Sequence, residues 1–99
     1  MNSNLRVIYM INGLILVGER VDGSHPGLRV VHTIGLVPGG EKGQLQTIEA
    51  FPFTDFDEEI SIEAGSYIAE TKLDDVRLKA EYNKAIKTIR EQKSGLILP

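Results

Sequence analysis

Short apolar runs separated by turn-forming residues dominate the first two thirds of this chain. Residues 5–11 and 14–21 are both rich in large apolar side chains, and Asn12-Gly13 separates them. Asn and Gly tolerate the positive φ that both central residues of a type I′ turn require, and this turn matches the twist of paired strands. The pattern therefore predicts an opening β-hairpin with a two-residue type I′ turn at Asn12-Gly13.

Three further segments have the composition or the alternation of β-strands. They are residues 28–37, residues 45–53, and residues 59–63 continuing into 67–70 after a bend at 64–66. Pro52 cannot donate to a strand ladder and marks an edge, a bulge or the end of its strand. Short strands at this spacing, with turn signals between them, predict a small barrel or sandwich.

Residues 73–92 have the period of one amphipathic helix. Its apolar stripe consists of Leu78, Tyr82, Ala85, Ile86 and Ile89. Asp74 and Asp75 suit the positive amino-terminal end of a helix, and the basic residues Lys87, Arg90 and Lys93 suit the negative carboxy-terminal end. We expect Gly95 to end the helix, and the apolar tail 96–98 to pack on the barrel or on a neighbouring subunit.

Length and composition indicate a single domain, in which residues 1–72 form the β body and residues 73–99 the helix and tail. Of the 99 residues, 41% are hydrophobic and 25% are charged, which is ordinary for a globular protein. The absence of cysteine excludes a disulfide framework, a cysteine zinc site and a thiol nucleophile. No signal peptide or membrane-spanning run is evident, so we expect a protein of the cytoplasm, or of a host cell's cytoplasm if the source is viral.

Charge is distributed unevenly along the chain. Residues 1–72 carry five Lys or Arg against ten Asp or Glu, whereas residues 73–99 carry six against four. Binding to nucleic acid draws much of its free energy from neutralised phosphates, so an acidic body disfavours avid non-specific binding. Any contact with RNA has to come from a local patch.

None of the candidate chemical motifs carries a catalytic or metal site. The glycine-rich segment 37–43 lacks the Gly-Lys-Ser/Thr ending of a phosphate loop and joins two strands, which favours a hairpin loop. The acidic residues Asp55, Asp57, Glu58 and Glu59 lack the calcium-loop pattern, which favours a solvated turn. His25 and His32 have no metal-ligand spacing. We therefore expect a protein that is not an enzyme and has no cofactor.

Two segments resemble the motifs of Sm and Sm-like proteins. Residues 13–21 resemble the first motif, in which one glycine opens a strand and a second follows about five residues later, and residues 62–68 resemble the second motif. Over most of the chain the similarity is to small Sm-like proteins of marine cyanobacterial viruses. It rests on Arg6-Val7-Ile8, Pro52-Phe53-Thr54, Ile60-Ser61-Ile62, Tyr82-Asn83 and the segment 95–99.

The resemblance implies a mainly β fold, a five-stranded, strongly bent Sm-like (SH3-type) barrel, here with one C-terminal α-helix. It also implies a homo-oligomeric ring of about five to seven subunits, joined by strand pairing. An open barrel leaves unpaired strand edges that such pairing removes. The candidate subunit-interface residues are Leu45, Thr47, Phe51, Ile60, Ile62 and Ile68.

Rings of this family commonly bind RNA, which makes single-stranded RNA a candidate partner beside further copies of the chain. The candidate contacts, chosen as basic, polar or aromatic groups near loops, are His25, Arg29, His32, Ser66 and Tyr67. Glu63-Ala64 stands where the second motif usually has Arg-Gly, and residues 28–34 contain no Asp-aromatic-Asn uridine pocket. These departures favour the alternative, a viral assembly or protein-interaction module that binds no RNA.

Overall fold

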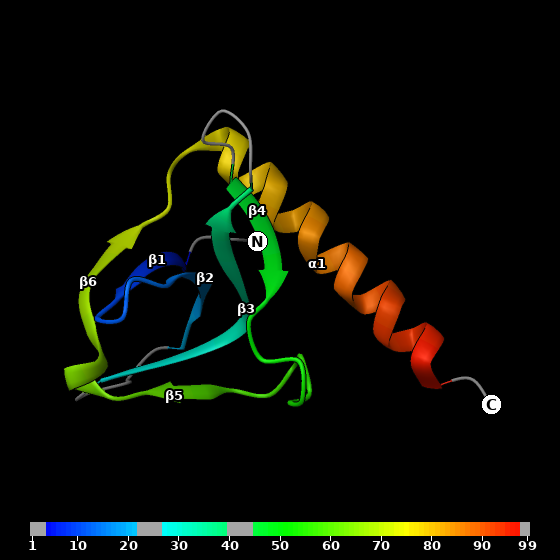
Figure 1. Ribbon diagram of the computed structural model, residues 1–99, viewed down its shortest axis with the longest axis horizontal. Coiled ribbons are helices and arrows are strands. Elements are labelled where there is room, and N and C mark those ends of the chain that lie inside the picture. The colour runs from blue at the N-terminus through cyan, green and yellow to red at the C-terminus, as the bar shows by residue number, and fades with distance from the viewer. Residues whose placement is uncertain (1–3, 22–26, 40–44, 98–99) are drawn as a thin grey trace.

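The computed structural model describes residues 4–21, 27–39 and 45–97. Its elements, in chain order, are β1 (Leu5–Met10), β2 (Ile15–Arg20), β3 (Leu28–Pro38), β4 (Leu45–Glu49), β5 (Ile60–Ile62), a 3₁₀ turn (Ala64–Ser66), β6 (Tyr67–Lys72) and α1 (Val76–Ile97). The prediction of a mainly β fold with one C-terminal helix is confirmed (Figure 1).

The strands form one antiparallel sheet in the order β4-β3-β2-β1-β6. The long β3 serves two neighbours on one side: its first residues pair with β5, at Leu28 and Ile62, and its last residues pair with β4, at Leu36 and Thr47. The two outer strands, β4 and β6, are not paired with each other. The sheet is therefore open, and the closed barrel of the sequence prediction is not formed within one chain.

The opening hairpin is present, but its turn differs from the prediction. Tyr9 pairs with Ile15, and the amide of Gly13 donates to the Met10 carbonyl at 3.0 Å. Gly13 has φ +92°, but Asn12 does not have a positive φ. In the described part of the chain, His32 is the one non-glycine residue with a positive φ. This is a three-residue loop, a turn followed by a left-handed glycine, instead of a type I′ turn. Asn12 contributes through its side chain, whose Oδ1 accepts from the Leu14 amide at 3.0 Å.

The fourth predicted strand is present as β4 with shorter bounds, whereas the fifth is divided into two strands with different partners: β5 pairs with β3, and β6, which runs to Lys72, pairs with β1. β4 ends at Glu49 because the chain turns beyond it: the Thr54 amide donates to the Phe51 carbonyl at 3.2 Å, around Pro52. The predicted bend at 64–66 is the 3₁₀ turn that leads into β6.

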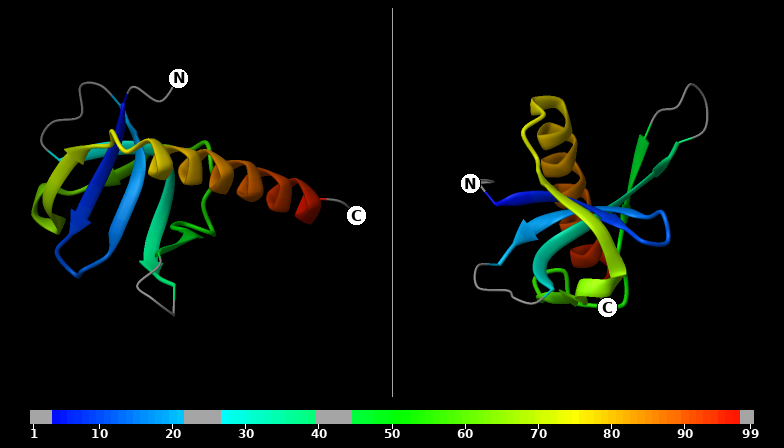
Figure 2. Two further views of the ribbon diagram at one scale, coloured as in Figure 1. Left: turned by 90° about the horizontal axis from the view of Figure 1, so that it is seen from above. Right: turned by 90° about the vertical axis from the view of Figure 1, so that its left-hand side faces the viewer.

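Both faces of the sheet are covered, which explains why β1 and β2 are apolar at successive positions. Alternate residues of a strand point to opposite faces. The face toward α1 buries Leu5, Val7, Val17, Ile34 and Leu36 with Tyr82, Ala85 and Ile89 of the helix. The other face, enclosed by the bent sheet, buries Ile8, Leu16, Leu28, Val30 and Ile62. Figure 2 shows α1 lying across the first of these faces.

The helix is amphipathic as predicted, but it begins and ends later. The Asp75 carboxylate caps it, with Oδ1 accepting from the amides of Arg77 at 2.9 Å and Leu78 at 3.1 Å. Leu73 lies before the helix and is buried.

Gly95 does not end the helix, which runs to Ile97. One interior glycine costs a helix about 1 kcal/mol, too little to stop it here. The last turns of α1 extend past the strands (Figures 1 and 2). Leu98 lies outside the described residues.

The apolar stripe of α1 should carry much of the stability. We expect Ile89→Ala to lower the free energy of unfolding by about 2–4 kcal/mol, because Ile89 is buried between helix and sheet. Lys87→Ala, an exposed position of the same helix, should change it by less than about 0.5 kcal/mol. Urea unfolding measures both, and equal effects would contradict this packing.

Candidate functional site

A β-bulge in the middle of β3 creates the most distinctive local geometry of the molecule. Glu19 of β2 pairs with Val31, and Val17 pairs with Ile34, so Gly18 faces two residues, His32 and Thr33. His32 has φ +53°, which is uncommon for a residue with a side chain. Such a conformation persists only where the surroundings hold it, and it is more frequent at functional sites.

Gly18 permits this bulge because the two strands approach closely there. A Cβ atom at position 18 would lie 2.8 Å from Thr33 Oγ1. Thr33 is itself buried, and its hydroxyl has no hydrogen-bond partner in the described part of the chain. With Thr33 in place, a side chain at position 18 would force the threonine or one of the strands to shift.

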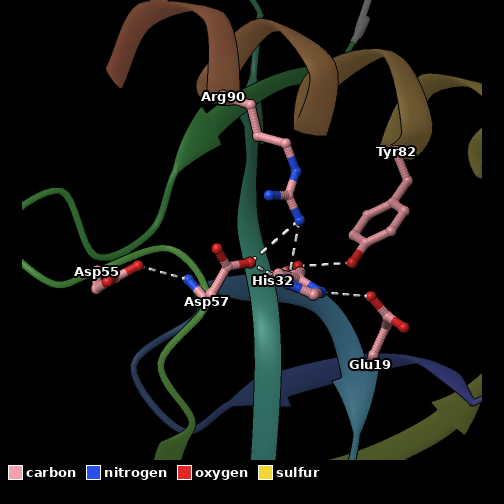
Figure 3. A network of polar contacts seen from close by, with 6 residues as sticks. All are labelled: Glu19, His32, Asp55, Asp57, Tyr82 and Arg90. Atoms are coloured by element: carbon pink, nitrogen blue, oxygen red, sulfur yellow. Dashed lines mark hydrogen bonds and ion pairs between the residues drawn. The ribbon is translucent and has the colours of Figure 1, made fainter. Parts of the chain in front are cut away.

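The bulge directs the His32 ring between two carboxylates from different elements (Figure 3). Nδ1 lies 2.7 Å from Glu19 Oε2, on β2, and Nε2 lies 2.7 Å from Asp57 Oδ1, in the turn between β4 and β5. Ionised carboxylates only accept hydrogen bonds, so both contacts are satisfied when each ring nitrogen carries a proton. The geometry is that of an imidazolium between two anions.

Arg90 of α1 completes this network from the helix side. Its Nη2 donates to Asp57 Oδ1 at 3.1 Å and lies 3.3 Å from His32 Nε2. The guanidinium also lies over the Phe56 ring, 5.5 Å from its centre, and the His32 ring is 5.3 Å from the same ring. The helix, the bulge and the turn 55–58 are thus joined at one place.

Tyr82 fixes the backbone of the bulge. Its hydroxyl donates to the His32 carbonyl oxygen at 2.6 Å (Figure 3). Burial raises the pKa of Tyr82 far above its ordinary value of 10.0, and the negative charge of Glu19 acts in the same direction. Tyr82 is therefore a neutral donor near neutral pH.

The acidic segment 55–59 is an ordered turn as well as a solvated one. Asp55 holds it, since its Oδ1 accepts from the Asp57 amide at 3.0 Å and its carbonyl accepts from the Glu58 amide at 3.0 Å. The hydrogen bond from His32 lowers the pKa of Asp57 below its ordinary value of 3.8; desolvation opposes this shift, and the positive charge of Arg90 supports it. Asp57 is thus an anion under ordinary conditions.

This network can hold a proton and joins three elements, and the hydroxyl of Tyr82 in it is bonded to a backbone carbonyl. The described residues also form no group of three or more His, Cys, Asp or Glu that could hold a metal ion. No helix among them is long and apolar enough to cross a bilayer.

The predicted RNA contacts do not come together as a basic patch in the structure. Arg29 pairs with Glu59 at 3.5 Å, and His32 lies in the acidic network. Ser66 donates its hydroxyl to the Glu63 carbonyl at 2.7 Å, and Tyr67 is half-buried against the core of the bent sheet. His25 lies outside the described residues.

The predicted interface residues divide between core and surface. Ile62 is buried in its own chain, and Phe51 and Ile60 pack partly on the same core. Thr47 lines a groove of about 510 Å³ between β4 and α1, whose apolar wall includes Leu78 and Ile89. On β6, Ile68 is 73% exposed. Leu45 begins β4, and its side chain lies outside the description.

Sequence reasoning missed four members of the network: Gly18, Glu19, Tyr82 as a hydrogen-bond donor, and Arg90. One signal was present, because a glycine inside an apolar strand often marks a bulge or a close backbone approach. The carboxylate and guanidinium partners carry no local signal, since 13, 25 and 58 positions separate Glu19, Asp57 and Arg90 from His32.

Comparison with known proteins adds no assignment. No model of a known protein family matches this chain, and no curated protein matches it in sequence.

The close approach at the bulge predicts a coupled pair of substitutions. Gly18→Ala should destabilise the fold by about 1–3 kcal/mol, because the new methyl group meets Thr33 Oγ1. Thr33→Ala removes that oxygen, so the double variant should be more stable than the sum of the single effects implies, by at least about 0.5 kcal/mol. A double-mutant cycle from urea unfolding measures this coupling, and additive effects would contradict it.

We expect the ionised Asp57 to contribute to the free energy of unfolding, and this contribution to be lost in acid. Its pKa is lower in the folded than in the unfolded chain, so its contribution is complete above the ordinary carboxyl pKa and disappears as the pH falls through the folded value. Asp57→Asn should be less stable than the parent near neutral pH by up to about 1 kcal/mol, since the group is mostly exposed. The difference in stability between Asp57→Asn and the parent should disappear near pH 2.

Urea unfolding between pH 7 and pH 2 tests this expectation. Asp74→Asn is the control, because Asp74 is also an exposed carboxylate and lies outside the network. A gap for Asp57→Asn that does not change with pH would count against the proposed role of its charge.

Proposed function

We propose that the chain is a non-catalytic, Sm-like assembly module that joins with copies of itself into a ring. The observation that carries this proposal is the pair of outer strands. β4 bonds only to β3 and β6 only to β1 among the described strands, so each presents a row of backbone donors and acceptors on its other side. Unpaired strand edges are templates for pairing with another chain.

The two edges differ, so they suit a head-to-tail contact in which β4 of one copy pairs with β6 of the next. Contacts of this kind form a closed ring when the rotation between neighbours closes. Exposed apolar side chains lie on both strands: Ile48 of β4 is 44% exposed and Ile68 of β6 is 73% exposed. The resemblance to Sm-like proteins implies about five to seven subunits, and a bent antiparallel sheet is compatible with it.

The groove between β4 and α1 would help the β4 edge to bind a strand of another chain. A strand that extends the sheet beyond β4 would have the helix beside it, and Leu78 and Ile89 would meet its apolar side chains. Burying apolar area contributes about 25 cal/mol per Å², so this wall would strengthen pairing beyond the backbone hydrogen bonds alone. Main-chain pairing with side-chain pockets beside it is an established mode of strand recognition.

The ion pairs around the candidate RNA contacts favour protein over RNA as the ligand of such a ring. The guanidinium of Arg29 already faces Glu59, and His32 faces Glu19 and Asp57. Phosphate would therefore have to displace carboxylates from the two described cations that sequence reasoning nominated for RNA. Binding of single-stranded RNA stays a second candidate, supported by the family resemblance.

The ring proposal predicts an assembled mass that depends on the β6 edge. The parent chain at tens of micromolar should give a mass of several subunits by light scattering, and Ile68→Lys should shift it to the monomer, because it places a charge in the contact. Ile11→Lys is the matched control: Ile11 is 68% exposed and lies in the β1–β2 loop, outside both outer strands. A monomeric parent, or equal effects of both variants, would overturn the proposal.

To test whether the ring binds RNA, the parent is titrated with short fluorescent U-rich and A-rich RNAs at low and at moderate salt. We expect no saturable binding at either. Saturable binding that weakens with salt and is lost in Arg29→Glu would instead establish the RNA function. Arg29→Glu should keep the mass of the parent, which separates this result from loss of assembly.

A further inference from the structure

We propose that His32 is a proton-operated clamp on the turn between β4 and β5. The turn is held against the sheet and helix while the ring carries two protons, and it loosens when the ring carries one. This inference concerns the fold of a single chain and does not depend on ring assembly.

The surroundings of His32 are acidic on nearly every side. Glu19 faces it from β2, Asp57 from the turn and Arg90 from α1. Glu49 of β4, together with Asp55 and Glu58 of the turn, lines the same small cavity as the ring, and Tyr82 bonds to its backbone. One guanidinium and several carboxylates thus lie around the ring.

Loss of one proton leaves the ring unable to satisfy both 2.7 Å contacts. Histidine is the side chain whose ordinary charge change falls between pH 5 and 8. In the neutral ring, one nitrogen presents a lone pair to a carboxylate oxygen, and these two acceptors repel each other. One of the two carboxylates must then move away.

The contacts identify Asp57 as the carboxylate that moves. At Nε2 a second donor is already at hand, because Arg90 Nη2 lies 3.3 Å away and can donate to a lone pair there. Nδ1 faces the Glu19 carboxylate, so the remaining proton is best kept on that side. Arg90 then holds Nε2, the helix stays in place, and Asp57 loses its place at the ring.

Packing limits the motion to a local loosening of the turn. Phe56 is buried in the core beneath α1 and anchors the turn at its centre. Next to it, the cavity shared by His32, Thr33 and Phe56 has a volume of about 10 Å³, close to the minimum for one water molecule.

Hydrogen exchange followed by NMR tests the clamp. The amides of Asp57 and Glu58 are bonded within the turn, so their protection reports on its order. After correction for intrinsic exchange, we expect their protection to fall at least fivefold between pH 5.5 and pH 8.5. The Tyr82 amide, in the helix, should keep its protection.

Two carboxamide variants separate the clamp from a general effect of pH. In Asp57→Asn the amide can either accept from a protonated Nε2 or donate to a neutral one, so the protection of Glu58 should not depend on pH. Asp55→Asn keeps the Oδ1 acceptor of the turn and leaves Asp57 intact, so it should keep the parent's dependence. His25 is unchanged in both variants and cannot account for a difference between them.

The ¹⁵N shifts of His32 provide an independent measurement. We expect both ring nitrogens protonated at pH 5.5 and the proton retained on Nδ1 at pH 8.5. A neutral ring protonated on Nε2, protection in the parent that does not change with pH, or a dependence that survives in Asp57→Asn would each overturn the proposal.

Discussion

The contact between Gly18 and Thr33 determines how the rest of this molecule is arranged. A side chain at position 18 would lie 2.8 Å from Thr33 Oγ1, so with Thr33 in place β2 and β3 approach there without distortion because residue 18 is glycine. The extra residue in β3 forms a bulge, and bulges bend the strand that carries them and increase its twist. The residues before the bend pair with β5 and those after it pair with β4, so one strand contributes to two parts of the sheet.

The bulge also brings the helix and the turn to the same point. It places the His32 carbonyl where the Tyr82 hydroxyl can reach it, and the His32 ring where Asp57 and Arg90 meet. A buried tyrosine needs a hydrogen-bond partner for its hydroxyl, and a strained residue needs contacts that hold its backbone. One hydrogen bond meets both needs, which couples the packing of α1 to the shape of β3.

The sequence predicts the strands and the helix of this fold better than it predicts their turns and ends. Turn signals, composition and periodicity locate the hairpin, the third strand and the helical stripe, because each of these depends on neighbours within a few positions. The type of turn at Asn12-Gly13 was wrong, since the same dipeptide also suits a three-residue loop in which Gly13 alone has positive φ. The helix end at Gly95 was wrong because a glycine permits a stop without requiring one.

The network around His32 was not predictable in the same way. Glu19 and Arg90 look like ordinary solvated charges in the sequence, and only the pairing of β2 with β3 and the docking of α1 bring them to one ring. Its composition bears on function nonetheless. A surface built to attract phosphate would keep its cations available, whereas here Arg29 and His32 face carboxylates of the same chain. Among the described strands, the outer edges of β4 and β6 keep unpaired backbone groups, and our proposal of a protein partner therefore rests on those edges.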